Sequence, residues 1–202
     1  MINAAAGVDV RRVIFTSTKY VCRGNDVPAH REYRPTTSYG QSKAEMEELV
    51  WTEGSKIPEW CITRPTTVWG PGMGKHYQKF LSLVLNGGYF HIGSKPVHKH
   101  MAYVENISWQ FECLISKPAA DVHQGIFYLA DYEPMILREW AEYLRTALGG
   151  PRIPTVPYPL AKCMAFVGDR IAETVFRKFP FTSFRLDNLT LDDVCNISAT
   201  QR

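Results

Sequence analysis

The sequence predicts an α/β protein built on a parallel, doubly wound sheet. Short apolar runs of the kind found in buried strands alternate with longer segments whose apolar residues recur every three or four positions, as in helices. The connections between them are short and rich in glycine and proline. Strands that alternate with helices in this way are typical of a parallel sheet with helices on both faces.

The first predicted elements are the end of a helix and a buried strand. Residues 2–6 read as the last turns of a helix, and Gly7 is a typical C-cap. Residues 13–15 form an apolar run typical of a strand buried in a parallel sheet. Three hydroxyl residues, Thr16-Ser17-Thr18, follow this strand directly.

A long helix and a second strand follow a polar loop. Thr37 or Ser38 can accept a hydrogen bond from the first helical amides, so we expect a helix from there to about Lys56. Three acidic side chains are expected on its outer side: Glu45, Glu47 and Glu48. Residues 59–63 read as a second buried strand, ended by Arg64-Pro65.

Further helices and strands alternate through the rest of the chain. Helices are expected over residues 76–85, 107–116 and 137–148, and strands over residues 97–104 and 125–129. After a proline-rich connector, five apolar residues recur at helical spacing and are expected to pack into the core: Leu160, Met164, Val167, Ile171 and Val175.

The composition excludes several classes of protein. Of the 202 residues, 45% are hydrophobic and 21% are charged, the balance of an ordinary globular protein. The net charge of +3 is scattered, so there is no basic stripe for nucleic acid. No apolar run approaches the roughly 18 residues that cross a bilayer. Because residues 1–7 do not resemble a signal peptide, we expect a cytoplasmic protein with no membrane partner.

Neither the cysteines nor the histidines predict a metal site. The five cysteines are widely spaced and contain no Cys-x-x-Cys pair, so buried reduced thiols are expected rather than a disulfide framework or a zinc ribbon. His98-Lys99-His100 has no third ligand at a plausible spacing. This segment is therefore expected to be a solvated or substrate-facing basic strand.

Tyr39 and Lys43 are the first candidates for catalysis. They lie four residues apart at the start of a predicted helix, and so on one face of it. A phenol has a pKa of about 10 in water, and a neighbouring ammonium lowers such a pKa by stabilising the phenolate. The pair thus suits a tyrosine general base. The same spacing also arises by chance between solvated neighbours, so the spacing alone leaves both readings open.

Two neighbouring segments support the catalytic reading. The hydroxyl cluster at residues 16–18 stands where a strand ends, and in open α/β sheets ligands bind beyond the carboxyl ends of the strands. Residues 64–72 follow the next strand. There Pro65 removes a backbone donor and fixes the chain, which lets the following amides and hydroxyls face a ligand.

Four segments together resemble the extended short-chain dehydrogenase/reductases, the branch of NAD-dependent nucleotide-sugar epimerases and dehydratases. Residues 13–18 are similar to the strand that ends in that family's catalytic Ser/Thr, and residues 38–45 to its S-Y-G-x-S-K helix start. Residues 64–71 are similar to its R-P-x-x-V-Y-G-P loop, with Trp69 in place of tyrosine. Residues 102–107 are similar to its Y-V-x-D-V segment, and the order and intervals of all four agree.

The resemblance implies roles for particular residues. Tyr39 would be the general acid/base, Lys43 would activate it, and Thr18 would orient the reacting hydroxyl. The implied cofactor is NAD or NADP, contacted by Thr16, Tyr39, Lys43, Pro65 and Val68. The implied substrate is a nucleotide-diphosphate sugar, contacted by Thr67, Lys99 and Arg185. A lysine at position 99 keeps the charge of the family's arginine but loses its bidentate fork.

The resemblance also implies a division of the chain. Residues 1–70 would be the C-terminal part of an incomplete, Rossmann-like dinucleotide-binding domain. Residues 71–202 would be mostly a small α/β substrate-binding subdomain, with some segments returning to the Rossmann sheet. The family's Gly-x-x-Gly-x-x-Gly turn, which seats the cofactor pyrophosphate, has no counterpart here. We therefore expect a chain truncated at both ends that binds the cofactor weakly.

Several alternatives stay open. Lys19-Tyr20, after Thr18, lacks the acidic pair typical of dehydratases, which favours an epimerase or a reductase. A 3β-hydroxysteroid or flavonol-type reductase is the first alternative, because such relatives share the Arg-Pro loop and the Val-x-Asn segment. A non-catalytic remnant or interaction module is the second, and it predicts no cofactor affinity. Relatives often dimerise through the helix that carries the tyrosine, so a homodimer also stays open.

Overall fold

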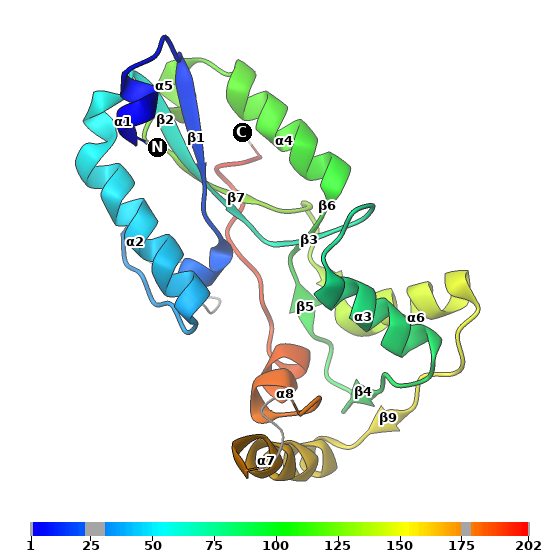
Figure 1. The fold of residues 1–202 in the computed structure, drawn as a ribbon. Coiled ribbons are helices and arrows are strands. Elements are labelled where there is room, and N and C mark those ends of the chain that lie inside the picture. Colours follow the sequence, from blue (N-terminus) through cyan, green and yellow to red (C-terminus); the bar gives the residue numbers. More distant parts are fainter. Residues whose placement is uncertain (1, 23–30, 175–178, 202) are drawn as a thin grey trace. The chain divides into compact units, whose positions relative to one another are not determined.

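A computed structural model describes residues 2–22, 31–174 and 179–201. The chain divides into two compact units (Figure 1). Unit 1 comprises Met1–Gly72, His100–Pro134 and Asp193–Arg202, and unit 2 comprises Met73–Lys99 and Met135–Asp192. The chain therefore leaves unit 1 twice and returns to it twice.

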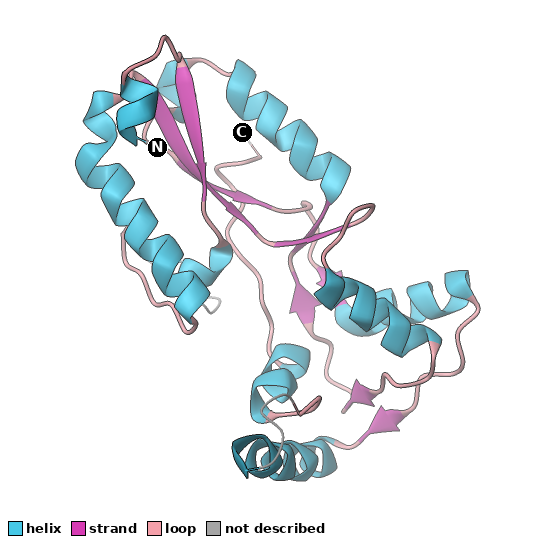
Figure 2. Cartoon of the chain, in the orientation of Figure 1, coloured by secondary structure: helices cyan, strands magenta, loops and turns pink. Residues whose placement is uncertain are grey.

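Unit 1 is built around a parallel sheet of three strands in the order β1-β2-β7 (Figure 2). These strands are β1 (Arg12–Thr16), β2 (Glu59–Pro65) and β7 (Ile126–Leu129). A second parallel pair joins β3 (Thr67–Trp69) to β6 (Met101–Tyr103). The parallel strands confirm the predicted fold class.

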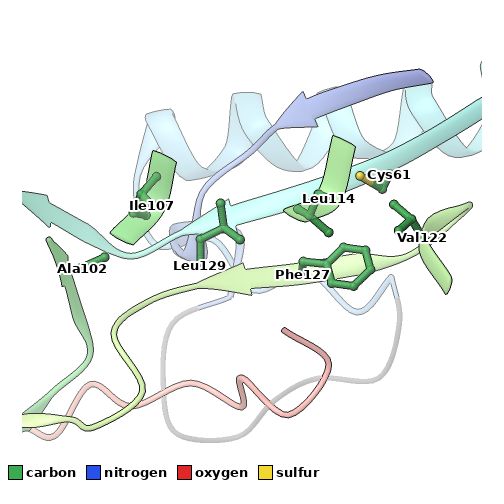
Figure 3. Close-up of a cluster of buried hydrophobic side chains, with 7 residues drawn as sticks. All are labelled: Cys61, Ala102, Ile107, Leu114, Val122, Phe127 and Leu129. Atoms are coloured by element: carbon green, nitrogen blue, oxygen red, sulfur yellow. The ribbon is translucent and has the colours of Figure 1, made fainter. Parts of the chain in front are cut away.

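Helices cover both faces of this sheet. Strand β2 sends Trp60 and Ile62 into one apolar cluster and Cys61 into another, because successive side chains of a strand point to opposite faces. The first cluster includes residues of α1 (Ile2–Ala6) and α2 (Ser38–Glu53). The second cluster, drawn in Figure 3, includes residues of α4 (Val104–Ser116) and α5 (Ala119–Val122). The described residues of unit 1 also include two short 3-10 helices: η1 (Lys19–Val21) and η2 (Gly54–Lys56).

Unit 2 contains four helices and two short strand pairs among its described residues. The helices are α3 (Lys75–Leu85), α6 (Leu137–Leu148), α7 (Tyr158–Thr174) and α8 (Ser183–Thr190). Strands β4 (His91–Ile92) and β9 (Thr155–Val156) pair in parallel, and β5 (His98–Lys99) and β8 (Met135–Ile136) pair antiparallel. Nowhere in the described ranges is a helix both long enough and apolar enough to cross a membrane.

The single strand expected over residues 97–104 is wrong. The segment forms β5 in unit 2 and β6 in unit 1, with His100 between them. The backbone N–H of His100 donates to the carbonyl of Asp193 at 3.0 Å, which interrupts the ladder, and its side chain is buried. The expectation of a solvated strand therefore fails at His100.

The predicted core stripe of α7 is also wrong. Leu160 and Val167 are each 54% exposed, and Met164 is 40% exposed. Instead Ala161 and Ala165 are fully buried and pack with Leu186 of α8, a helix that the sequence did not predict. Small side chains such as alanine let two helices approach closely. A prediction from hydrophobic periodicity favours large apolar residues instead, and so it selected the wrong face of the helix. Val175, the last member of the stripe, lies outside the described residues.

Arg12 joins the start of β1 to the end of α4. Its guanidinium pairs with Glu59 at 2.6 Å and donates to the carbonyls of Leu114, Ile115 and Lys117. These carbonyls lie at or just after the last turn of α4, where a helix has no internal donors for them and where a positive charge is favourable. Arg12 therefore caps a helix from the neighbouring strand.

We predict that Arg12→Met lowers the free energy of unfolding by about 2–4 kcal/mol, because it leaves carbonyls and a carboxylate without their buried partner. Urea denaturation followed by circular dichroism measures the loss. Arg11→Met is the matched control, since Arg11 meets the same Glu59 from a side chain that is 68% exposed, against 5% for Arg12. The control should cost less than about 1 kcal/mol. Equal losses would contradict the capping role.

Candidate active site

Lys43 and Thr16, predicted from separate segments, meet in the structure. The Lys43 ammonium donates to the carbonyl oxygen of Thr16 at 2.8 Å. Thr16 is the last residue of β1, so this hydrogen bond places the ammonium at the carboxyl end of that strand. Ligands of open α/β sheets bind at this end.

Tyr39 lies one helical turn before Lys43 and is 54% exposed. Thr37 caps the helix by accepting a hydrogen bond from the backbone N–H of Gly40 at 3.0 Å, as predicted for this position. Gly40 lets the helix lie directly on η1, because a Cβ there would stand 2.4 Å from the carbonyl oxygen of Tyr20. The exposed phenol of Tyr39 thus lies in the first turn of a helix that packs closely against η1.

Thr18 begins η1 and is buried. Its hydroxyl oxygen accepts a hydrogen bond from the backbone N–H of Tyr20 at 3.4 Å, so it caps this short helix. The neighbouring Ser17 hydroxyl is also buried and has no hydrogen-bond partner among the described residues. The turn between β1 and α2 therefore holds two hydroxyls close to the carbonyl that Lys43 binds.

The Arg-Pro segment is held against β7. Both the backbone N–H and the hydroxyl of Thr66 donate to the carbonyl of Leu129, at 3.0 and 3.2 Å. Pro65 ends β2, and Thr67 and Val68 lie half-buried in β3. These three candidates are therefore in unit 1, with Tyr39 and Lys43.

Glu47 forms a buried ion pair with Arg64, so its expected place on the outer side of the helix is wrong. Its carboxylate accepts hydrogen bonds from Arg64 Nε at 3.0 Å and Nη2 at 2.6 Å. Arg64 Nη1 donates to the hydroxyl of Tyr128 at 3.0 Å. Helical periodicity alone predicts that a glutamate lies on the exposed face of a helix. It carries no information about a buried arginine on a neighbouring strand.

Lys99 and Arg185 lie in unit 2. The Lys99 ammonium donates to the carbonyl of Leu191 at 2.8 Å, and Arg185 is exposed on α8.

Sequence reasoning missed a polar cluster beside Thr18. Lys19 is buried and forms an ion pair with Asp193. His100 is buried as well, and its Nδ1 accepts a hydrogen bond from the backbone N–H of Cys195 at 2.9 Å. Burial and the positive charge of Lys19 lower the pKa of His100, while burial raises the pKa of Cys195 to about 11. The cluster therefore favours a neutral imidazole and a protonated thiol rather than a reactive cysteine.

A cavity of about 780 Å³ in unit 1 is lined by residues of α4, β7 and the C-terminal segment, including Trp109, Phe127 and Thr200. None of the candidate residues lines it. Within the described ranges, no group of three or more His, Cys, Asp and Glu side chains is placed to hold a metal ion. The unit 1 candidates therefore lie at and after the ends of β1 and β2 and at the start of α2, outside the lining of this cavity.

Comparison with known sequences gives a family and two relatives. The model of the 3-beta hydroxysteroid dehydrogenase/isomerase family matches residues 1–160. An uncharacterized protein of Sinorhizobium fredii is 28% identical over 156 residues, covering 73% of this chain and 43% of the relative. A 2-alkyl-3-oxoalkanoate reductase of Stenotrophomonas maltophilia is 23% identical over 167 residues, covering 76% and 49%. The chain thus spans about half the length of the curated relatives it matches.

Comparison with solved structures shows the fold. The crystal structure of a UDP-glucuronic acid 4-epimerase from Bacillus cereus, in complex with NAD, matches with a TM-score of 0.63 at 18% identity. The match covers 77% of this chain and 53% of the epimerase. The Rossmann-like α/β fold expected from the sequence is thereby confirmed.

We predict that His100 makes stability fall with acidification. Its pKa is lowered in the folded state, so below about pH 6.5 the unfolded state takes up the proton first, and stability is lost as the pH falls towards the folded pKa. His100→Asn keeps an acceptor for the Cys195 N–H and removes this titration. Urea denaturation at about pH 7 and pH 5 should show the original chain losing more of its free energy of unfolding than the variant does. His91 is present in both chains, so its own titration cancels. Parallel losses would contradict the prediction.

Proposed function

This chain belongs to the 3-beta hydroxysteroid dehydrogenase/isomerase family, and from this premise we propose that it carries the acid–base side of a nicotinamide-dependent oxidoreductase site. The expected relationship to the extended short-chain dehydrogenase/reductases is confirmed by the family and by its structural neighbours. One observation carries the proposal: Lys43 is fixed on the carbonyl of Thr16, and Tyr39 stands exposed one turn away on the same helix face.

The residues present suit the nicotinamide end of NAD or NADP. Thr16 and Tyr39 are exposed and Lys43 is half-buried, and the half-buried Pro65 and Val68 offer apolar surface. The chain has no glycine-rich turn for the pyrophosphate, so we expect this chain to bind the whole dinucleotide weakly. When bound, the nicotinamide supplies hydride transfer.

The proposed steps use three side chains. The hydroxyl of Thr18 would orient the substrate alcohol, and the phenolate oxygen of Tyr39 would take the alcohol proton as hydride passes from the carbon that bears this hydroxyl to the nicotinamide. The Lys43 ammonium would stabilise the phenolate form of Tyr39, which is the proton acceptor. In the reverse direction Tyr39 would return the proton to the carbonyl oxygen of a ketone.

The first candidate substrate is a nucleotide-diphosphate sugar. It is supported by the four sequence segments and by the likeness of the fold to a UDP-glucuronic acid 4-epimerase. Thr67 would contact the sugar, and Lys99 and Arg185 of unit 2 would contact the phosphates. In this proposal residues 1–70 belong to the dinucleotide-binding domain, and residues 71–202 mostly to the substrate-binding subdomain.

The second candidate is a hydrophobic secondary alcohol or ketone, such as a 3β-hydroxysteroid. Two comparisons favour it: the matching family is named for 3-beta hydroxysteroid dehydrogenases, and one relative is a 2-alkyl-3-oxoalkanoate reductase. Lys99 also already donates to the carbonyl of Leu191, which lessens its capacity for phosphate. The chemistry proposed for Tyr39 and Lys43 is the same for both substrates.

We predict that Tyr39→Phe lowers nicotinamide reduction by the chain at least about 100-fold, because it removes the acid/base group. The absorbance of reduced nicotinamide measures the rate, with UDP-glucuronate in one arm and a 3β-hydroxysteroid in the other. Tyr143→Phe is the control, since Tyr143 is an exposed tyrosine of unit 2 outside the proposed site. Only one substrate class should support reduction.

Two outcomes would oppose the proposal. Tyr39→Phe turning over at the original rate would remove the acid/base role. A chain that reduces no nicotinamide in either arm, and whose tryptophan fluorescence is unchanged by NAD, would instead favour a non-catalytic remnant or interaction module.

A further inference from the structure

Among the described residues of unit 1, the most deeply buried charged side chains are close in sequence to residues of the proposed site. Glu47 is fully buried and Arg64 is 3% exposed. The Glu47 carboxylate accepts two hydrogen bonds from the Arg64 guanidinium, and a third N–H of that guanidinium donates to the hydroxyl of Tyr128 on β7. Such a pair is costly to desolvate, so its presence adds little stability over an apolar pair of similar size. The geometry it imposes therefore needs another reason.

We propose that Arg64 and Glu47 are positioning residues, which fix the rotation of α2 and thereby the placement of Tyr39 and Lys43. This inference rests on the proposed function of those two residues. The polar groups of Arg64 and Glu47 are engaged with each other and with Tyr128, so both act through the helix rather than on a substrate.

The spacing of the residues supports this role. Tyr39, Lys43 and Glu47 recur every four positions, so they form one stripe along α2. Lys43 is bound to Thr16 at the end of β1, and Glu47 is bound to Arg64 near the end of β2. The two strands are neighbours, with Thr16 paired to Thr63. The helix is therefore tied to two adjacent strands at points one turn apart.

Apolar packing alone leaves this half of the helix poorly oriented. The buried residues that precede Glu47 are Gly40 and Ala44; Met46, immediately before Glu47, is only partly buried, and the buried Val50 lies further along. Gly40 and Ala44 permit close approach but interlock little, and hydrophobic contact has no preferred direction. A bidentate guanidinium–carboxylate pair does have one.

Arg64 links the helix to the second half of the proposed site as well. It immediately precedes Pro65, the first residue of the segment that includes Thr67 and Val68. Its guanidinium is held by the hydroxyl of Tyr128 and lies 5.4 Å from the centre of that ring. One ion pair thus relates the Tyr39–Lys43 helix to the loop proposed to line the nicotinamide.

Two changes test the role. Arg64→Lys keeps the charge but loses the fork, and the double variant Arg64→Met/Glu47→Leu replaces the pair by apolar side chains, a change that is often neutral or stabilising. Val50→Ala is the matched control, because it weakens the packing of α2 without touching the pair. Thermal unfolding followed by circular dichroism ranks the stability of all three.

The first readout is the ammonium resonance of Lys43 in chain made with isotope-labelled lysine. This signal persists only while the ammonium is protected by a hydrogen bond, and it requires neither cofactor nor activity. We expect it in the original chain and in Val50→Ala, and expect its loss in Arg64→Lys and in the double variant. Its persistence in the double variant would overturn the proposal.

The second readout is nicotinamide reduction. Both pair variants should lower turnover about 100-fold with little change in KM, since small misplacement of catalytic groups has effects of this size. The double variant should do so even if its thermal stability is unchanged. Turnover that follows stability alone, as in Val50→Ala, would overturn the positioning role. If the original chain reduces no nicotinamide and its tryptophan fluorescence is unchanged by NAD, the proposed function fails, and the Lys43 resonance still decides the positioning of the helix.

Discussion

The seating of α2 on its sheet is the constraint on which the proposed site depends. Lys43 binds the carbonyl at the end of β1, and Glu47 binds a buried arginine near the end of β2. Gly40 lets the same helix approach the Tyr20 carbonyl more closely than any side chain would allow. Three directional or steric conditions therefore meet on one helix face. They leave the phenol of Tyr39 exposed one helical turn before a fixed ammonium, the arrangement on which the proposed acid/base role rests.

Polar groups from distant parts of the chain organise the rest of unit 1 in a similar way. Arg12 caps α4 across 105 residues of sequence, and Lys19 pairs with Asp193 across 174. Both side chains are nearly buried, so each must find charged or carbonyl partners inside the fold. The Lys19 pair also ties the turn that carries Thr18 to the segment returning from unit 2. The interior of unit 1 is thus specified by polar contacts as well as by its apolar clusters.

Much of the local structure could be predicted, because hydrophobic periodicity and helix capping depend on residues that are close in sequence. The helix over residues 137–148 and the Thr37 cap show this. The failures share one cause, which is the absence of partner information in a local pattern. Glu47 is buried because it pairs with Arg64. The strand predicted over residues 97–104 is interrupted because the backbone N–H of His100 donates to the carbonyl of Asp193. Helix α7 buries Ala161 because α8 packs against it. The Tyr39–Lys43 pair could be proposed from a family motif, whereas Lys19–Asp193 belongs to none of the motifs recognised.

The central claim is that Tyr39 and Lys43 face the nicotinamide end of a cofactor. Nicotinamide mononucleotide tests it most directly, because it has the ring and ribose but does not need the glycine-rich turn that this sequence lacks. It would be titrated into chain labelled at the tyrosine rings and lysine ammonium groups. The predicted result is a saturable shift of the Tyr39 and Lys43 resonances, with the exposed Tyr143 unmoved. A saturable shift confined to other residues, or none at any concentration, would contradict the claim.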